Sequence, residues 1–367
     1  MKIKILSLLV LSFFVFNATW AINLNKGTDT LHAAALKPFG RTIINAAKKL
    51  ELISSAAHFG FKFSGDSCVI FADVPDAWAH NYLQYEIDGV YQNRIRIDGK
   101  KPGPVIIKAA GNGEHTIWIY KATEAHTGAI VIGDIVAKKA KAISVAKAPL
   151  IEFIGNSITC GAAADDSEYP CGTGDYHDQH NAYMAYGPRV ARKLGANYLM
   201  SSVSGIGIYR VWNADGPSMP DVYENLDFHV DSKQKWNFNT YSPKIVSIAL
   251  GTNDFSTGDG KSVRSPFDNE VFVTRYVKFI QLIKSKYPKA QIAVLSSPMV
   301  KGAQQEVFEK LLMEIKNHVD ALYPKDKEVK TFFFKPMDPH GCTSHPSVAD
   351  HEILANELYP FYQAMLK

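Results

Sequence analysis

The sequence predicts an α/β protein of two domains, an all-β domain followed by a parallel sheet with helices on both faces. The first observation is the length of 367 residues, which exceeds the usual size of a single small domain. The second is a series of short strand-like runs over residues 48–146. The third is an alternation of strands and helices from residue 147 onward.

The predicted strands of the first half are rich in β-branched and aromatic residues, and several alternate between polar and apolar positions. Gly, Asp, Asn or Pro separates them at spacings of about ten residues, which is typical of a β-sandwich or jelly roll. The runs are residues 67–73, 82–88, 94–98, 104–108 and 115–121.

In the second half of the chain, the apolar pattern changes from strand-like runs alone to strands that alternate with helices. Its strand-like runs are residues 150–154, 198–203, 245–250, 291–295 and 329–334, and helical patterns occupy residues 182–194, 269–287, 303–322 and 347–365. This alternation predicts a doubly wound parallel sheet, whose strands all end at one edge where ligands bind. A stretch rich in Lys and Ala over residues 138–148 divides the halves, so the predicted domains are residues 22–146 and 147–367.

The N-terminus has the pattern of a secretory signal peptide. Lys2 and Lys4 precede an apolar run over residues 5–16, and the small residue Ala21 stands at the expected cleavage site. The run falls short of the roughly 20 residues that span a bilayer, although an uncleaved anchor is the alternative. We therefore predict that residues 1–21 are removed and that the protein is secreted or periplasmic, with no membrane span afterwards.

The composition argues against a nucleic-acid-binding protein and against a disulfide-built scaffold, and it leaves the pairing of one expected disulfide undetermined. The net charge of +4 is scattered without a basic stripe, so nucleic acid is not an expected partner. Four cysteines are too few for a disulfide-built scaffold, but one bridge among Cys160, Cys171 and Cys342 is expected, with the pair undetermined. His177 and His180 share a loop that offers no further ligands in its sequence, so we expect a solvated loop and no metal site.

A turn around Ser157 carries the strongest functional signal. An apolar run over residues 151–154 stops at Gly155, and Ser157 follows where a helix should begin. The free backbone N–H groups of a helix start suit an oxyanion, so this is a suitable place for a nucleophile. The alternative is an ordinary tight turn capped by a serine.

Three further blocks, each placed just after a predicted strand or before a predicted helix, favour the catalytic interpretation. They contain Gly205, Asn253 and His345. Because the strands of a parallel sheet end at one edge, the four blocks can converge on one cleft. His345 could accept the proton of Ser157, and the backbone N–H groups of Ser157 and Gly205 with the Asn253 amide could form an oxyanion hole.

These blocks resemble a known superfamily. Gly155-Asn-Ser157, Gly205, Gly251-Thr-Asn253-Asp and His345-Pro resemble the four blocks of the SGNH (GDSL-like) hydrolases. Longer runs around them look like carbohydrate esterase family 2, and residues 115–124 followed by Gly128 are similar to the jelly-roll signature of that family. The runs around the blocks are residues 154–161, 204–210, 250–256 and 341–347.

The resemblance implies a flavodoxin-like α/β/α hydrolase domain behind an N-terminal jelly roll. It implies an exported esterase that removes O-acetyl groups from plant polysaccharides such as xylan or glucomannan, through an acetyl-serine intermediate. Ser157 would be the nucleophile, His345 the base, and Ser157, Gly205 and Asn253 the oxyanion hole. That chemistry needs no metal or cofactor, and its partner is an acetylated polysaccharide or oligosaccharide. The oligomeric state stays open.

One departure concerns the acid behind the histidine. Many family members carry Asp two residues before the histidine, where this chain has Thr343, and the spacing of the wider superfamily falls on Cys342. The favoured hypothesis is a Ser–His dyad in which a backbone carbonyl holds the other ring nitrogen. The alternative is that Asp338 or Asp350 folds in as a substitute acid.

His340 is a rival base only five residues away from His345. We prefer His345 because Pro346 beside it is suited to open a helix, which matches the block as the superfamily places it.

The substrate-binding residues are less defined. Trp212 and Phe255 could offer aromatic faces to a sugar ring, with ordinary packing as the alternative, and Asp254 and Arg210 could brace the site by hydrogen bonds.

Two other functions remain open. A lipase or thioesterase of the same superfamily would need a long apolar acyl groove. A non-catalytic carbohydrate-binding protein would not need the intact Ser157, Asn253 and His345.

Overall fold

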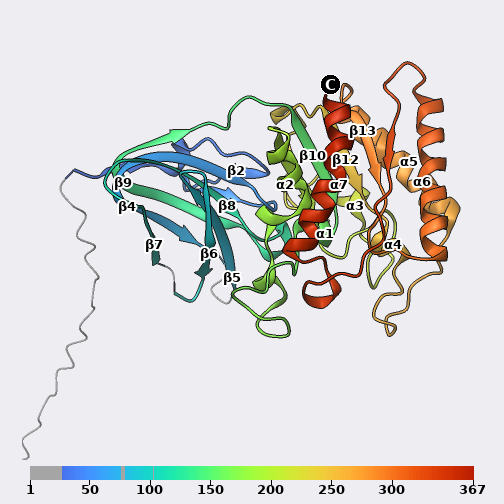
Figure 1. The fold of residues 1–367 in the computed structure, drawn as a ribbon, viewed down its shortest axis with the longest axis horizontal. Coiled ribbons are helices and arrows are strands. Elements are labelled where there is room, and N and C mark those ends of the chain that lie inside the picture. The colour runs from blue at the N-terminus through green and yellow to red at the C-terminus, as the bar shows by residue number, and fades with distance from the viewer. Residues whose placement is uncertain (1–26, 76–78, 102) are drawn as a thin grey trace, which may run out of the picture.

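The computed structural model describes residues 27–75, 79–101 and 103–367. The predicted signal peptide, residues 1–21, lies outside these ranges. Figure 1 shows an all-β lobe, formed by the first part of the chain, beside a lobe in which strands and helices alternate. The strands of the first lobe are β1 Asp29–Leu31, β2 Thr42–Ile44, β3 Leu50–Leu52, β4 His58–Asp73, β5 His80–Ile87, β6 Val90–Asp98, β7 Gly103–Lys108, β8 Glu114–Lys121 and β9 Ile130–Ile143.

All strand pairs of the β-domain are antiparallel, in the order β2-β3-β9-β4-β8-β5-β6, with β1 added to β9 and β7 to β4. Leu50, Leu83, Ile97 and Ile107 come from different parts of this sheet but are buried in one core. The sheet therefore folds over on itself, which confirms the predicted antiparallel β-domain.

The predicted runs omit the short strands β1, β2 and β3, the first part of β4 and the whole of β9. β4 begins at His58, well before residue 67, and Phe59, Phe61 and Phe63 on it are completely buried. β9 was not predicted as a strand, although β4 pairs with it over much of its length. β9 was missed because its second half is rich in Lys and Ala, so the apolar pattern fades while the hydrogen-bonded ladder continues.

The second domain holds a parallel sheet in the order β11-β10-β12-β13-β14. Counted along the domain, this is the order 2-1-3-4-5 of flavodoxin-like folds, as the resemblance implied. The strands are β10 Leu150–Gly155, β11 Asn197–Ser202, β12 Ile245–Ala249, β13 Gln291–Leu295 and β14 Lys330–Phe332. Gly155 is in register with Ser202 and Ala249, so β10, β11 and β12 end side by side at one edge of the sheet.

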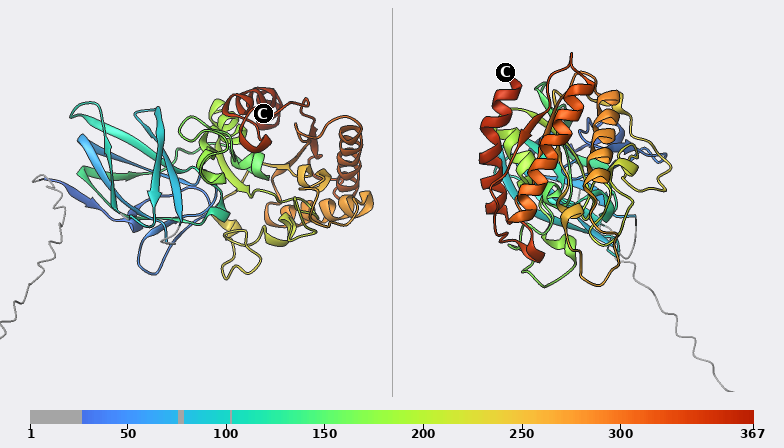
Figure 2. Two further views of the ribbon diagram at one scale, coloured as in Figure 1. Left: turned by 90° about the horizontal axis from the view of Figure 1, so that it is seen from below. Right: turned by 90° about the vertical axis from the view of Figure 1, so that its right-hand side faces the viewer.

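Helices cover both faces of this sheet (Figures 1 and 2). The helices α2 Tyr186–Lys193 and α7 Val348–Leu366 share one core with Phe153 of β10. The helices α3 Met219–Val222, α5 Asn269–Lys286 and α6 Ala303–Leu322 share another core with Ile154. Successive residues of a strand point to opposite faces, which explains why Phe153 and Ile154 belong to different cores. None of the helices within the described ranges has the length and apolar character required to cross a membrane.

A buried cation joins the two domains. Arg41, just before β2, is fully buried and donates hydrogen bonds to the backbone carbonyls of Tyr223, at 3.0 Å, and Asn225, at 2.6 Å. Its guanidinium lies 4.1 Å from the centre of the Phe228 ring. Burial raises the pKa of Glu152 on β10, and the charge of Arg41 opposes that rise. Removal of Arg41 would therefore leave a buried carboxylate without its cation.

We expect Arg41→Ala to lower the free energy of unfolding by about 2–6 kcal/mol, because the two buried carbonyls each lose a donor at a cost of about 1–3 kcal/mol. Denaturant titration followed by circular dichroism measures the change. Lys49→Ala, which removes an exposed cation from the same domain, is the matched control and should be nearly neutral. Equal midpoints for the two variants would show that Arg41 does not stabilise the domain junction.

Candidate active site

Ser157 stands at the sheet edge where β10 ends. It opens the one-turn helix α1 Ser157–Cys160, and the Asn156 side chain caps this turn by accepting the N–H of Ile158 at 3.0 Å. Gly155 is required here, since a Cβ at this position would lie 2.0 Å from the Thr159 hydroxyl oxygen. The tight turn places Ser157 beyond the end of the strand, where 7% of the residue is exposed.

His345 contacts the Ser157 hydroxyl. Its Nε2 lies 2.9 Å from Ser157 Oγ, and its Nδ1 lies 2.9 Å from the backbone carbonyl oxygen of Thr343. A carbonyl can only accept, so Nδ1 carries the proton and Nε2 is the free acceptor. Thr343 and Ser344 both have positive φ angles, 48° and 58°, and this left-handed pair turns the Thr343 carbonyl back toward the imidazole.

The protonation state of His345 suits a general base. Burial lowers the pKa of His345 below its ordinary value, and the hydrogen bond to the Thr343 carbonyl partly opposes this effect. The imidazole is therefore neutral at neutral pH, with Nε2 able to accept the proton of Ser157.

The predicted disulfide forms between Cys171 and Cys342. It ties the loop after α1 to the segment that carries His345. Cys160 and Cys68 are buried and not bridged. Because 171 positions separate the paired cysteines, sequence spacing alone did not reveal the pair.

Neither of the two alternative acids is hydrogen-bonded to His345. Asp338 is exposed and forms an ion pair with Lys301. Asp350 is buried, caps α7 through the N–H of Ser347 at 2.9 Å and contacts Nδ1 of His340 at 2.9 Å. His340, the rival base, is thus paired with Asp350, whereas His345 faces Ser157.

Gly205 and Asn253 follow the two strands that flank β10. Gly205 follows β11 with a φ of 74°, a left-handed conformation that favours glycine, and its carbonyl accepts the N–H of Trp212 at 2.8 Å. Asn253 lies on the one-turn helix α4 Thr252–Phe255 after β12. Its amide nitrogen donates one hydrogen to the carbonyl of Ile206 at 2.8 Å. This hydrogen bond orients the amide along the loop that carries Gly205. The amide nitrogen carries a second hydrogen, which this bond does not use.

Asp254 braces this loop. Its carboxylate accepts the backbone N–H groups of Ile208, Tyr209 and Arg210 at 2.9–3.1 Å. The Arg210 guanidinium donates in return to the backbone carbonyl of Asp254. A Cβ on Gly207 would lie 2.3 Å from the Asp254 carboxylate, so that position must be glycine. The predicted bracing role of Asp254 and Arg210 is confirmed.

Comparisons with known proteins identify the two domains. Residues 39–146 match the N-terminal domain of carbohydrate esterase 2, and residues 153–325 match the GDSL-like lipase/acylhydrolase family. The chain belongs to carbohydrate esterase family 2. The chain is therefore a carboxylic-ester hydrolase.

The matches to individual relatives cover different fractions of this chain and of the relative. An acetylxylan esterase/glucomannan deacetylase of Cellvibrio japonicus is 29% identical over 315 residues, which is 84% of each chain. The cellulase/esterase CelE of Acetivibrio thermocellus is 30% identical over 293 residues, 76% of this chain, but the match spans only 33% of CelE. The structure of a family two carbohydrate esterase from Clostridium thermocellum in complex with cellohexaose superposes with a TM-score of 0.76 at 27% identity, covering 92% of this chain and 99% of that one.

The β-domain of this family 2 esterase contributes a residue that the sequence interpretation missed. Glu124 is 5% exposed, and its carboxylate accepts the backbone N–H of Ser204 at 2.5 Å and the thiol of Cys160 at 3.4 Å. Burial alone would raise the pKa of Glu124, but His180 and the Ser204 N–H outweigh burial and lower it to about 2. A carboxylate from one domain therefore holds the residue before Gly205 in the other.

Tyr176 is a second residue that sequence reasoning missed. Its hydroxyl lies 3.3 Å from Nε2 of His345 and 3.3 Å from the Ser204 hydroxyl. It belongs to a loop whose turn, Tyr176–Gln179, follows Cys171 of the disulfide. No motif marks a tyrosine in an irregular loop, so only the folded chain reveals this contact.

The two candidate aromatic platforms differ. Trp212 is 48% exposed and lies beside Gly205. Phe255 is 7% exposed, and its ring packs against Phe267 and Phe308 with centroid distances of 4.3 and 4.9 Å. Ordinary packing therefore describes Phe255, because its ring faces are occupied by neighbouring side chains.

We expect Glu124→Ala to lower kcat for an aryl acetate by about ten- to hundredfold, since a buried N–H loses a charged acceptor. Glu124→Gln is the matched control, because its amide oxygen can still accept the Ser204 N–H, and it should retain most of the activity. Steady-state kinetics, with circular dichroism to verify folding, provides the measurement. A folded Glu124→Ala enzyme with the kcat of the wild type would refute the positioning role.

Proposed function

We propose that this family 2 esterase removes O-acetyl groups from plant polysaccharides such as acetylated xylan or glucomannan. The observation that carries the proposal is the 2.9 Å contact between Ser157 Oγ and a His345 imidazole whose Nδ1 is held by a carbonyl. The named relative from Cellvibrio japonicus, an acetylxylan esterase/glucomannan deacetylase, supports the choice of substrate.

The reaction would proceed in two acyl transfers. His345 Nε2 takes the proton of Ser157 as its oxygen attacks the acetyl carbonyl, and the resulting imidazolium gives that proton to the departing sugar oxygen. This leaves acetyl-Ser157. Water then attacks, with His345 as base, and acetate is released as Ser157 regains its proton.

The oxyanion of each tetrahedral intermediate would be bound by the backbone N–H groups of Ser157 and Gly205 and by the Asn253 amide. These groups follow three adjacent strands, and the hydrogen bond from Asn253 to Ile206 supports their orientation before substrate arrives. Preorganised donors of this kind are worth on the order of 3 kcal/mol each in transition-state stabilisation. Trp212 would offer its exposed ring to a sugar unit beside this hole.

We further propose that catalysis runs with a Ser–His dyad. The Thr343 carbonyl orients the imidazole as the acid of a triad would, since it fixes the Nδ1–H tautomer and the plane of the ring. It supplies a dipole in place of a full negative charge, and so stabilises the imidazolium less than a carboxylate would. The involvement of Asp338 with Lys301 and of Asp350 with His340 supports this choice.

Export is part of the proposal. The positive and apolar N-terminal segment, residues 1–21, has the composition of a secretory signal, and the Cys171–Cys342 disulfide suits an oxidising compartment. An extracellular or periplasmic location would bring the enzyme to polymeric substrates.

We expect the wild-type enzyme to release acetate from acetylated xylan or acetylated glucomannan, and Ser157→Ala to release none above the uncatalysed rate. Loss of the nucleophile removes the acyl-enzyme route, and an enzymatic acetate assay measures the product. Ser204→Ala, which removes a neighbouring hydroxyl, is the matched control and should remain active.

Two results would contradict this function. Wild-type rates in Ser157→Ala would refute the catalytic assignment. A clear preference for p-nitrophenyl octanoate over the acetate would indicate a lipase-type acyl site.

For the dyad, we expect Asp338→Asn and Asp350→Asn to keep kcat within about a few-fold of the wild type, because neither carboxylate touches His345, whereas losing the acid of a true triad costs about 10⁴-fold. Kinetics on an aryl acetate provides the comparison. His345→Ala serves as the reference for complete loss, and a comparable loss in either Asp variant would establish a triad.

A further inference from the structure

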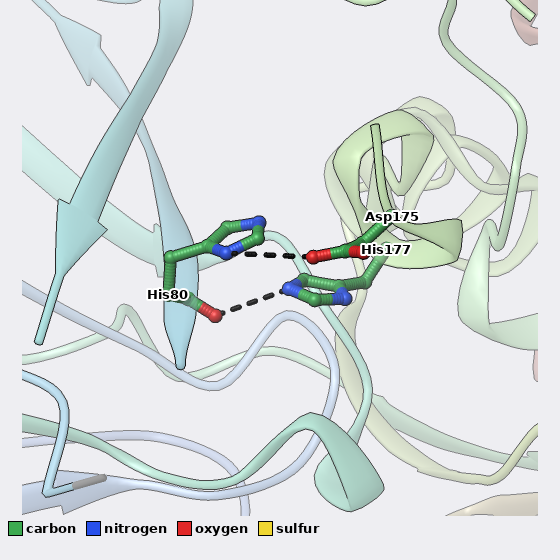
Figure 3. A group of neighbouring side chains, drawn as sticks. All are labelled: His80, Asp175 and His177. Atoms are coloured by element: carbon green, nitrogen blue, oxygen red, sulfur yellow. Dashed lines mark hydrogen bonds and ion pairs between the residues drawn. The ribbon is translucent and has the colours of Figure 1, made fainter. Parts of the chain in front are cut away.

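Three side chains with metal-binding groups meet where the β-domain contacts the loop that carries Tyr176. They are His80 on β5, and Asp175 and His177 on that loop, as Figure 3 shows. One ring nitrogen from each histidine and one carboxylate oxygen all lie within 4.8 Å of one another. The expectation that this loop lacks further ligands is therefore wrong, since Asp175 stands two residues before His177 and the other domain supplies His80.

The hydrogen bonds around the two histidines orient both rings. Nε2 of His80 contacts a carboxylate oxygen of Asp178 at 2.5 Å, and Asp178 is almost completely buried. Nε2 of His177 lies 3.1 Å from the backbone carbonyl of His80. Nε2 of His80 therefore donates its hydrogen to Asp178, which leaves Nδ1 of His80 with a free lone pair. The His177 nitrogen that faces His80 in Figure 3 is Nε2, so its hydrogen must move to Nδ1 when a metal ion binds there. Histidines that bind metals typically hold their second nitrogen against a carboxylate or carbonyl, as His80 does with Asp178.

The Nδ1 of His80 is directed toward Asp175. The distance from this nitrogen to a carboxylate oxygen of Asp175 is 3.8 Å, too long for a hydrogen bond but close to the separation of two ligands on one ion. The rings of His80 and His177 stack with their centres 4.3 Å apart. The cluster thus holds two imidazoles and a carboxylate together without direct hydrogen bonds among the three potential ligand atoms.

We propose that Nδ1 of His80, Nε2 of His177 and the Asp175 carboxylate bind a divalent transition-metal ion, with zinc the best match. Zn²⁺ commonly takes two imidazoles and a carboxylate, with water at the fourth position. Ligands about 2 Å from a tetrahedral ion lie about 3.3 Å apart, so the loop must close by roughly 1 Å. Asp175 has 70% of its side chain exposed, so it can turn toward the buried His80.

The consequence of binding is a cross-link between the domains. Asp175 and His177 flank Tyr176, whose hydroxyl lies 3.3 Å from His345 Nε2. An ion bound to both residues and to His80 would fix this loop on the β-domain. It binds the folded protein more tightly than the unfolded chain and so raises the melting temperature. This proposal concerns a structural ion and does not depend on the substrate of the esterase.

The test uses the full-length, untagged enzyme, stripped with a chelator and titrated calorimetrically with ZnCl₂. We expect one ion per chain and a higher melting temperature with Zn²⁺. His177→Gln keeps a donor for the His80 carbonyl, and Asp175→Asn keeps an oxygen for the local turn. Each should weaken Zn²⁺ binding by more than about tenfold and abolish the visible absorption of tetrahedral Co²⁺ in the substituted protein.

His32→Gln is the matched control. His32 contacts Asp134 at 3.1 Å, but this pair is exposed. Among the described residues, no third metal-binding side chain completes a site with it, so the loss of His32 should leave Zn²⁺ affinity unchanged. Absence of one-to-one binding by the wild type at millimolar Zn²⁺ would overturn the proposal. Wild-type affinity in both folded loop variants would overturn it as well, because the ion would then bind elsewhere.

Discussion

The hydrogen bond from His345 Nδ1 to the Thr343 carbonyl is the contact on which the geometry of the candidate site depends. It decides which ring nitrogen is free, and the free nitrogen is the one that faces Ser157. The bond forms because two consecutive non-glycine residues adopt left-handed backbone angles. Such a conformation is costly and persists only where the surroundings hold it. Here the Cys171–Cys342 disulfide holds one side, and the cap of α7 holds the other.

The β-domain is part of the site architecture. Glu124 reaches from it to the backbone of Ser204, Arg41 is buried among carbonyls of the second domain, and His80 contacts the loop that carries Tyr176. These side chains are buried and polar, so each must find its partners across the junction or lose free energy. The junction therefore favours one arrangement of the two domains, which keeps the loops around Ser157 in place.

Local patterns were sufficient to predict much of the molecule. The strand runs that end at Gly155, before Gly205 and at Leu250 appear as expected, because short apolar runs bounded by glycine are strong strand signals. Prediction failed for β9, where Lys and Ala replace large apolar side chains although the backbone ladder continues. The role of Phe255 stayed open between sugar binding and packing, since a sequence does not reveal whether an aromatic ring near a motif faces solvent or Phe267.

The sequence by itself determined the order of the functional blocks, the parallel sheet that aligns them and the family to which they belong, because each rests on residues adjacent in the chain. Only the tertiary structure decided which carbonyl holds His345, which cysteines pair and which residues join His177. The disulfide joins positions 171 residues apart, and His80 and His177 are 97 residues apart. The Thr343 carbonyl is only two residues from His345, but its direction depends on the left-handed turn that the packed chain holds in place. The energies of these contacts depend on burial and on distances between atoms, which arise only when both segments have packed against the same core.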